Sequence, residues 1–374
     1  MTKKILIPVP INKLKPIGGP YGYLYNLNSG LKEICDKSID ISFLPNEEIL
    51  EIKNSKIKKI IWKIYIILQI ILAPCSKKKL NLEDVDIVHF HGTIDMYLHQ
   101  NSLKKYKGTV LLSSHSPVIW HKEFQELLGK KYKFIWGVIE KIDEYAFQKA
   151  DYLIFPCEEA EEPYFNSWKK YRTIRENKKV KYILTGINMC YARMDRISVR
   201  NSLNIPKDAK VICYVGRHNT IKGYDLLKKA YEEEWKYKGF YVLVAGNEEP
   251  IKGIRDDEHW IEIGWTSDPY SYINAADMFV LPNRDTYFDL VLLEALSLNQ
   301  DVALSETGGN KYFKRFISSN ILFFNCNDAE DLAICISKYL DSYPESHTNV
   351  EIYKNNFTQK IFAQKYIDMI ATIR

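Results

Sequence analysis

The sequence has no regular cysteine pattern. Its seven cysteines are scattered over 374 residues, and no two of them form a C-x-x-C pair. An odd, unpatterned set argues against a disulfide scaffold and against a zinc site, and it favours a reducing compartment. The amino terminus, "MTKKILIPVP", also lacks the long apolar stretch of a signal peptide. We therefore expect a cytoplasmic protein.

A large excess of charge of one sign is also missing. The 52 basic residues stand against 47 acidic ones, for a net charge of +5, so an electrostatic role must come from local clusters. The basic residues cluster beside aliphatic side chains rather than beside a platform of exposed aromatics. This arrangement argues against nucleic-acid binding.

Two nucleotide-binding fingerprints are absent where they would be expected. The stretch "YVGRHNTIKGYDLLKKAY" (214–231) lacks the G-x-x-x-x-G-K-[ST] pattern of nucleoside-triphosphate P-loops. The stretch "YVLVAGNEE" (241–249) lacks G-x-G-x-x-G, which counts against a dinucleotide cofactor.

The chain does contain a regular alternation of strands and helices. Apolar runs of strand length are continuous rather than alternating, as in parallel strands that are covered on both faces. Alternation of such runs with helical patterns indicates right-handed crossovers and doubly wound α/β sheets. The strands are expected at residues 4–10, 40–45, 86–92, 109–115, 152–157, 211–216, 241–246, 260–265, 278–283 and 301–306.

This pattern starts twice, so we predict two Rossmann-like domains. The chain length, with 46% hydrophobic and 26% charged residues, suits two globular cores. A boundary at about residues 190–208 gives domains at 1–195 and 205–355, followed by a helix within 356–374. Two such halves facing one another place a ligand in the cleft, at the carboxyl ends of the strands.

Residues 53–79 form the most basic apolar segment of the chain. They hold eight lysines and no acidic residue around an apolar run of about 13 residues, which is shorter than the roughly 20 that a spanning helix needs. A helix of this kind with Trp62 and Tyr65 suits an anionic membrane interface. A core helix with solvated lysine flanks is the alternative.

The loop after the first strand of the second series predicts a phosphate site. The strand ends at Gly216, Arg217 follows, and Lys222 and Gly223 stand just before a helix. Two cations five residues apart across a tight loop can converge on a diphosphate, and the helix amino end adds its dipole. A basic surface loop is the alternative.

Taken together, the motifs resemble the GT-B-fold nucleotide-sugar glycosyltransferases, specifically the large retaining family numbered four. The resemblance runs through nearly the whole chain in order and spacing. Its motifs are "IGGPYGYLYNL" (17–27), "DIVHFHG" (86–92), "SSHSP" (113–117), "YILTGIN" (182–188), "VGRHNTIKGYDLL" (215–227), "VLVAGNEE" (242–249), "IGWTSDPYSYINAADMFVLPN" (263–283), "LVLLEAL" (290–296), "SETGGN" (305–310) and the final helix.

The resemblance implies roles for particular residues. Arg217 and Lys222 would bind the donor diphosphate, so no metal or other cofactor is expected. Glu294 matches the second carboxylate of the family's Glu-x7-Glu motif and would hold the ribose hydroxyls. The backbone N–H groups of Asp289, Leu290 and Val291 would point at the phosphates.

One position departs from the family pattern. Thr286 stands where the first Glu of that motif usually contacts the donor sugar, and the usual "EGFG" reads "TYFD". Either Thr286 or the neighbouring Asp285 would replace that carboxylate. The turn at 305–310 keeps only the backbone roles of the family's sugar-pocket turn.

The resemblance also places residues of lesser weight. Gly18 and Gly19 match a mobile loop near the phosphate, with a plain turn as the alternative. A preference for the donor base would depend on the loop at Gly264 and Trp265. His115 matches a histidine near the reacting sugar, with a structural or surface histidine as the alternative. His89 and His91 face one side of a strand without a third metal ligand, so they are interpreted as cleft or packing residues.

The implied protein is a retaining, metal-independent glycosyltransferase with an acceptor-binding first domain, a donor-binding second domain and a final helix that crosses back to the first. It would act in capsule, exopolysaccharide or other surface-glycan assembly, at the inner face of the cell membrane, on a glycan or lipid-linked acceptor. A non-catalytic glycosyltransferase-like partner and a GT-B-fold nucleotide-sugar epimerase are the alternatives.

Overall fold

The computed structural model describes residues 2–9, 14, 19–34, 36–45, 64–65, 67–316, 320–342 and 348–373. The chain divides into two compact units. The first comprises Met1–Pro156, Pro163–Ile183 and Ala363–Arg374, and the second comprises Cys157–Glu162 and Leu184–Phe362.

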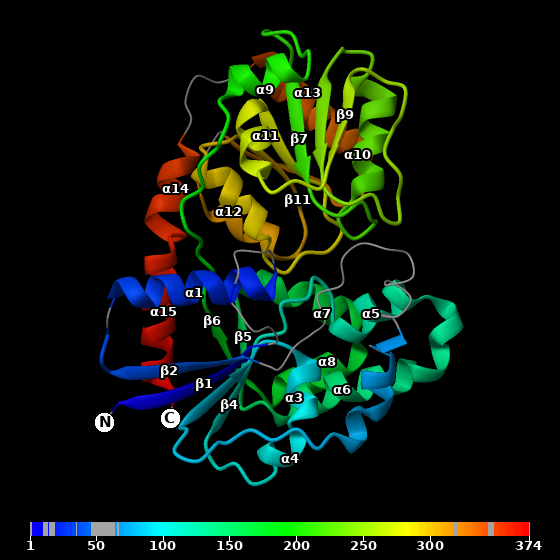
Figure 1. The fold of residues 1–374 in the computed structure, drawn as a ribbon. Coiled ribbons are helices and arrows are strands. Elements are labelled where there is room, and N and C mark those ends of the chain that lie inside the picture. The colour runs from blue at the N-terminus through cyan, green and yellow to red at the C-terminus, as the bar shows by residue number, and fades with distance from the viewer. Residues whose placement is uncertain are drawn as a thin grey trace. The chain divides into compact units, whose positions relative to one another are not determined.

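The first unit contains a parallel six-stranded sheet in the order β2-β1-β3-β4-β5-β6 (Figure 1). Its strands are β1 (Lys3–Val9), β2 (Ile39–Pro45), β3 (Ile87–Phe90), β4 (Thr109–Leu112), β5 (Tyr152–Phe155) and β6 (Lys179–Tyr182). Its helices include α1 (Pro20–Ile34), α3 (Thr93–Leu98), α4 (Gln100–Leu103), α5 (Trp120–Leu128), α6 (Trp136–Lys149) and α8 (Lys169–Glu176). The intervening α7 (Glu162–Ser167) begins at the last residue of the 157–162 segment of the second unit.

The second unit contains another parallel six-stranded sheet, in the order β12-β11-β10-β7-β8-β9. Its strands are β7 (Val211–Val215), β8 (Tyr241–Ala245), β9 (Trp260–Gly264), β10 (Met278–Leu281), β11 (Val302–Ser305) and β12 (Ile321–Phe324). Its helices include α9 (Arg196–Ser202), α10 (Tyr224–Ala230), α11 (Pro269–Ala275), α12 (Leu290–Ser297), α13 (Ala329–Ser342) and α14 (Asn349–Asn356).

These two sheets confirm the predicted α/β fold class. All ten predicted strands are present, and most of them are apolar runs with buried side chains. Strand β2, at the edge of the first sheet, is half-buried to exposed. Two edge strands, β6 and β12, were not predicted. The sequence of β6, "KVKY", has no apolar run, and the four-residue "ILFF" of β12 is too short for periodicity to tell a strand from part of a helix.

The final helix, α15 (Gln359–Thr372), begins in the second unit and ends in the first. Thr358 Oγ1 accepts a hydrogen bond from the backbone N–H of Ile361 at 3.3 Å, as expected for an N-cap. Farther along, Lys3 Nζ of β1 donates to the carbonyl of Ile370 at 3.0 Å, and the Tyr366 hydroxyl lies 3.0 Å from Nδ1 of His89. The last residues therefore complete the packing of the first sheet.

The basic segment at 53–79 is described only at residues 64–65 and 67–79; residues 53–63 and 66 lie outside the described part. Residues 67–72 are helical, and this helix buries Ile67 and Ile70 against a core that includes Ile139 and Ile142 of α6. Its other side exposes an apolar face formed by Ile64, Leu68, Ile71 and Leu72. Among the residues described, no helix is long and apolar enough to cross a bilayer.

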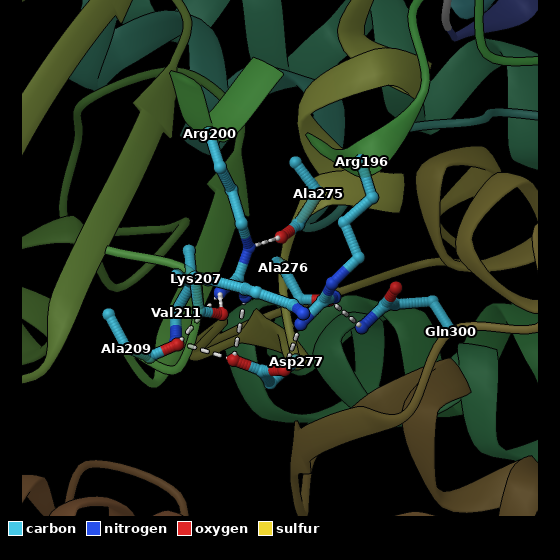
Figure 2. A network of polar contacts seen from close by, with 9 residues as sticks. All are labelled: Arg196, Arg200, Lys207, Ala209, Val211, Ala275, Ala276, Asp277 and Gln300. Carbon is cyan, nitrogen blue, oxygen red and sulfur yellow. Dashed lines mark hydrogen bonds and ion pairs between the residues drawn. The ribbon is translucent and has the colours of Figure 1, made fainter. Parts of the chain in front are cut away.

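A buried ion pair ties together the amino ends of β7 and β10 (Figure 2). Asp277 Oδ2 accepts hydrogen bonds from Arg200 Nη2 at 3.0 Å and from the backbone N–H of Val211 at 2.8 Å, and its Oδ1 accepts one from Arg196. The Arg200 side chain is only 4% exposed. Its other N–H groups donate to the carbonyls of Lys207, Ala209 and Ala275, each at 2.9 Å. This network attaches α9 to the amino ends of the strands of the second sheet, opposite their carboxyl ends.

Replacing Asp277 with alanine is expected to destabilise the protein by roughly 3 kcal/mol or more, because it removes the carboxylate that pairs with the buried Arg200. Thermal and urea unfolding of the full chain measure this change. Asp341→Ala is the matched control: Asp341 is 63% exposed in its pair with Lys238, and its loss should cost less than about 1 kcal/mol. Equal effects of the two substitutions would contradict the structural role of Asp277.

Candidate active site

The predicted phosphate loop is a tight turn between β7 and α10. Its carboxyl end requires a glycine: Gly223 has φ of 65°, and an added Cβ would lie 1.7 Å from the carbonyl oxygen of Pro282. Asn219 Oδ1 accepts a hydrogen bond from the backbone N–H of Lys222 at 2.8 Å. The loop thereby holds the Lys222 backbone close to the end of β10.

Lys222 and Asp289, 67 residues apart in the chain, form an ion pair. Lys222 Nζ lies 2.7 Å from each carboxylate oxygen of Asp289, and both side chains are 18% exposed. Asn283 Nδ2 also donates to Asp289 Oδ2. The predicted cation therefore lies beside the predicted helix start, but it pairs with the Asp289 carboxylate, a contact that the sequence did not predict.

Arg217 lies in the same loop as Lys222, near Tyr214. Its side chain is exposed, and its carbonyl accepts a hydrogen bond from the Tyr214 hydroxyl at 2.8 Å. Burial raises the pKa of that phenol well above its usual value; the charge of Asp289 raises it further, and the charge of Arg217 opposes this. Both charged groups therefore lie close enough to Tyr214 to act on it.

Helix α12 begins as predicted, with Asp289 at its N-cap position and Leu290 and Val291 in its first turn. The Asp289 side chain makes no capping hydrogen bond to the helix backbone. An N-cap carboxylate ordinarily accepts from the first N–H groups of its helix. The helix amino end therefore keeps backbone donors of the kind that bind phosphate.

Glu294 lies on the same helix, and its carboxylate has few polar contacts. Its Oε1 is 3.5 Å from the Tyr270 hydroxyl, and within the described part of the chain no cation lies at ion-pair distance from it. Burial raises the pKa of Glu294 to about 7, although the Tyr270 hydroxyl opposes this shift. A carboxyl with this pKa and unused acceptor capacity suits a ligand that donates hydrogen bonds.

Thr286 is fully buried, which bears on the departure from the family motif. Within the described chain its hydroxyl has no hydrogen-bond partner, while its carbonyl accepts from the backbone N–H of Gly309 at 3.2 Å. Asp285, next to it, is half-buried. As the side chains stand, Asp285 is the more accessible of the two candidates for the missing carboxylate.

The glycine turn at 305–310 packs directly on the loop before α12. Ser305 Oγ donates to the Asn283 carbonyl at 2.6 Å, and Thr307 Oγ1 donates to the Arg284 carbonyl at 2.8 Å. An added Cβ on Gly309 would lie 2.1 Å from the Tyr287 carbonyl oxygen. These contacts hold the two loops together as one surface.

The predicted base-side loop follows β9. The backbone N–H of Gly246, at the end of β8, donates to the Gly264 carbonyl at 2.9 Å, and Gly264 itself has φ of 72°. Trp265 is 72% exposed. An exposed indole beside the carboxyl ends of two strands offers a flat apolar surface to an aromatic ligand.

The first unit contains a histidine cluster formed by the buried His89 and His91 and the half-buried His115. His91 Nδ1 lies 2.8 Å from His115 Nε2, and His89 Nε2 lies 3.0 Å from the Ser113 hydroxyl. Burial lowers the pKa of His89 and of His115 to about 3 and the pKa of His91 well below its usual value. All three rings are therefore neutral at physiological pH, and His115 is positioned by a partner that the sequence did not assign to it.

The remaining predicted residues lie before α1. Gly18 lies outside the described residues. Gly19 has φ of 75°, and its carbonyl accepts a hydrogen bond from the backbone N–H of Tyr23 at 3.1 Å. This geometry is that of a glycine preceding a helix. Among the described residues, no group of three or more His, Cys, Asp or Glu side chains is arranged to hold a metal ion.

Comparison with known proteins identifies the type of domain that holds this site. Residues 209–342 match the family described as glycosyl transferases group 1. The O-antigen biosynthesis glycosyltransferase WclY of Escherichia coli is 23% identical over 372 residues, covering 93% of each chain.

Solved structures share the fold over the whole chain. Sucrose-phosphate synthase from Thermosynechococcus elongatus matches with a TM-score of 0.67 and 17% identity, covering 99% of each chain. HepE from Anabaena, solved in complex with UDP-glucose, matches with a TM-score of 0.64 and 13% identity, covering 99% of this chain and 100% of that one. Residues 209–342 therefore match a group 1 glycosyltransferase domain, and the whole chain has the GT-B fold of these solved structures.

Proposed function

We propose that the protein transfers a sugar from a nucleoside-diphosphate donor to an acceptor hydroxyl, with retention of the anomeric configuration and without a metal ion. The observation that carries this proposal is that Lys222 lies at the amino end of α12, the helix that also holds Glu294. From Leu290 to Glu294 the helix rises about 6 Å. This spacing suits a ligand with phosphate at one end and ribose hydroxyls at the other.

The proposed chemistry relies on charge. The bond between the sugar C1 and the phosphate oxygen breaks while the acceptor oxygen bonds to C1 on the same face. The departing phosphate accepts the acceptor's proton, and its developing charge is stabilised by Arg217 and Lys222. These two cations then do what a metal does in other transferases.

The proposed acceptor is a lipid-linked glycan at the inner face of the cell membrane. The similarity to an O-antigen glycosyltransferase supports a role in surface-glycan assembly. The exposed apolar face formed by Ile64, Leu68, Ile71 and Leu72, followed by the exposed lysines 77–79, supports peripheral contact with anionic lipid.

A second candidate is a non-catalytic partner that binds nucleotide in support of another transferase. The observation that favours it is the buried Thr286 hydroxyl in place of the usual sugar-contacting carboxylate. Binding of a nucleotide sugar without turnover, even with lipid-linked acceptors supplied, would favour this candidate over the enzyme.

Arg217→Ala is expected to weaken donor binding by roughly tenfold or more, because a charge-assisted hydrogen bond contributes about 1.5–3 kcal/mol. Calorimetry and released nucleotide, screened over UDP-, GDP-, dTDP- and CMP-sugars, measure binding and turnover. Lys238→Ala is the control, because Lys238 stands before the amino end of β8 and pairs with Asp341. A donor that binds wild type and Arg217→Ala equally would remove Arg217 from the site.

Donor affinity is expected to rise roughly tenfold between pH 6 and pH 8, because binding of ribose hydroxyls favours the ionised form of Glu294. The free carboxyl has a pKa of about 7, so it is mostly protonated at pH 6 and must lose that proton on binding. The phosphates of a nucleotide sugar stay ionised throughout this range. Titration calorimetry of wild type and Glu294→Gln tests the idea, and a pH dependence that persists in Glu294→Gln would refute it.

Leu68→Glu is expected to reduce co-sedimentation with phosphatidylglycerol-containing vesicles by roughly tenfold, because burying one leucine side chain contributes about 1.5–3 kcal/mol. Ile197→Glu is the control, since Ile197 is a comparably exposed aliphatic residue on α9. Equal loss in both variants would indicate a general effect of negative charge, and no loss in either would exclude the apolar face from the contact.

A further inference from the structure

The Asp289 carboxylate already binds Lys222, which is a cation of the proposed donor site. Its two carboxylate oxygens are 2.7 Å from Lys222 Nζ, and Asn283 donates to one of them. The pair is largely shielded from water, since each side chain is only 18% exposed. Screening by solvent is therefore weaker than for a surface ion pair.

The position of this carboxylate is unusual for its place on a helix. Asp289 is the N-cap residue of α12, yet its side chain bonds to Lys222 and Asn283 rather than to the helix backbone. The amino end of a helix attracts anions, and so does Lys222. The carboxylate thus takes the lysine contact that a phosphate would take, while the first-turn N–H groups are left to a ligand.

We propose that Asp289 sets the affinity of this site for a nucleoside diphosphate by competing with the phosphate for Lys222. This inference rests on the proposed function. A donor must displace the Asp289 carboxylate from Lys222 to gain that cation, which lowers its net binding energy. After transfer, Asp289 recovers Lys222 as the nucleoside diphosphate leaves, so the same contact speeds product release.

The opposite role is a purely structural one, in which Asp289 orients Lys222 for the phosphate. The two roles predict opposite changes in affinity. If Asp289 competes, removing its charge strengthens diphosphate binding; if it orients, removing its charge weakens it. Asp289→Asn keeps the shape of the side chain, removes its charge and replaces one acceptor oxygen with an NH2 donor.

The experiment is calorimetry on the full chain with UDP and GDP, and with uridine and guanosine as ligands that lack phosphate. Asp289→Asn is expected to bind the diphosphate that wild type prefers roughly tenfold more tightly, the scale of one partly shielded charge pair, and to bind the nucleoside unchanged. In a Lys222→Ala background the same substitution should give no gain. Asp341→Asn, which removes an exposed carboxylate from α13, should match wild type.

Each outcome decides one question. Unchanged or weaker diphosphate binding by Asp289→Asn, with wild type binding normally, overturns the competition and leaves the proposed function standing. A gain that persists without Lys222 also overturns it, because the effect is then general repulsion. Absence of nucleotide binding in wild type and in a folded Asp289→Asn variant overturns both the donor site and this inference.

Discussion

A close approach between two backbone segments of the second unit determines the geometry of the predicted phosphate site. Gly223 touches the carbonyl of Pro282 so closely that no side chain fits between them. The Arg284 backbone N–H donates to the Ile221 carbonyl at 2.8 Å, and the Arg284 side chain binds Asp225 through two hydrogen bonds of 2.6 Å. These contacts hold the loop after β7 and the loop after β10 in fixed positions relative to each other. They therefore also set the position of Lys222 relative to α12.

Strands β7 and β10, which carry these two loops, are also held together at their amino ends. The amino ends of β7 and β10 share the buried Asp277 carboxylate, and their carboxyl ends share the contact at Gly223. Parallel strands joined in this way at both ends have little freedom to slide. Side chains mounted at the carboxyl ends are then held in place before a ligand arrives, which reduces the ordering cost of binding.

The fold was largely predictable from sequence, and the site only in part. Continuous apolar runs predict the buried strands, and the spacing of Phe362, Tyr366 and Ile370 predicts the last helix, because each pattern follows from burial of a local segment. The pairing of Lys222 with Asp289 joins residues 67 positions apart. No local pattern encodes such a contact. The family motif has a glycine at position 289, so the resemblance predicts no partner for the Asp289 carboxylate. The burial of Thr286 likewise depends on residues distant in the sequence, such as Gly309, so no local pattern predicts it.

The closing of the first sheet by α15 has a consequence for how the chain folds during synthesis. Lys3 and Ile370 form a hydrogen bond across 367 positions of sequence, and the His89 ring in the middle of that sheet meets the Tyr366 hydroxyl. Domains generally fold as units as they emerge from the ribosome, the amino-terminal one first. Here the amino-terminal unit lacks part of its own core until residues 363–374 have been translated. The ribosome must therefore finish the second unit before the first can reach its native packing.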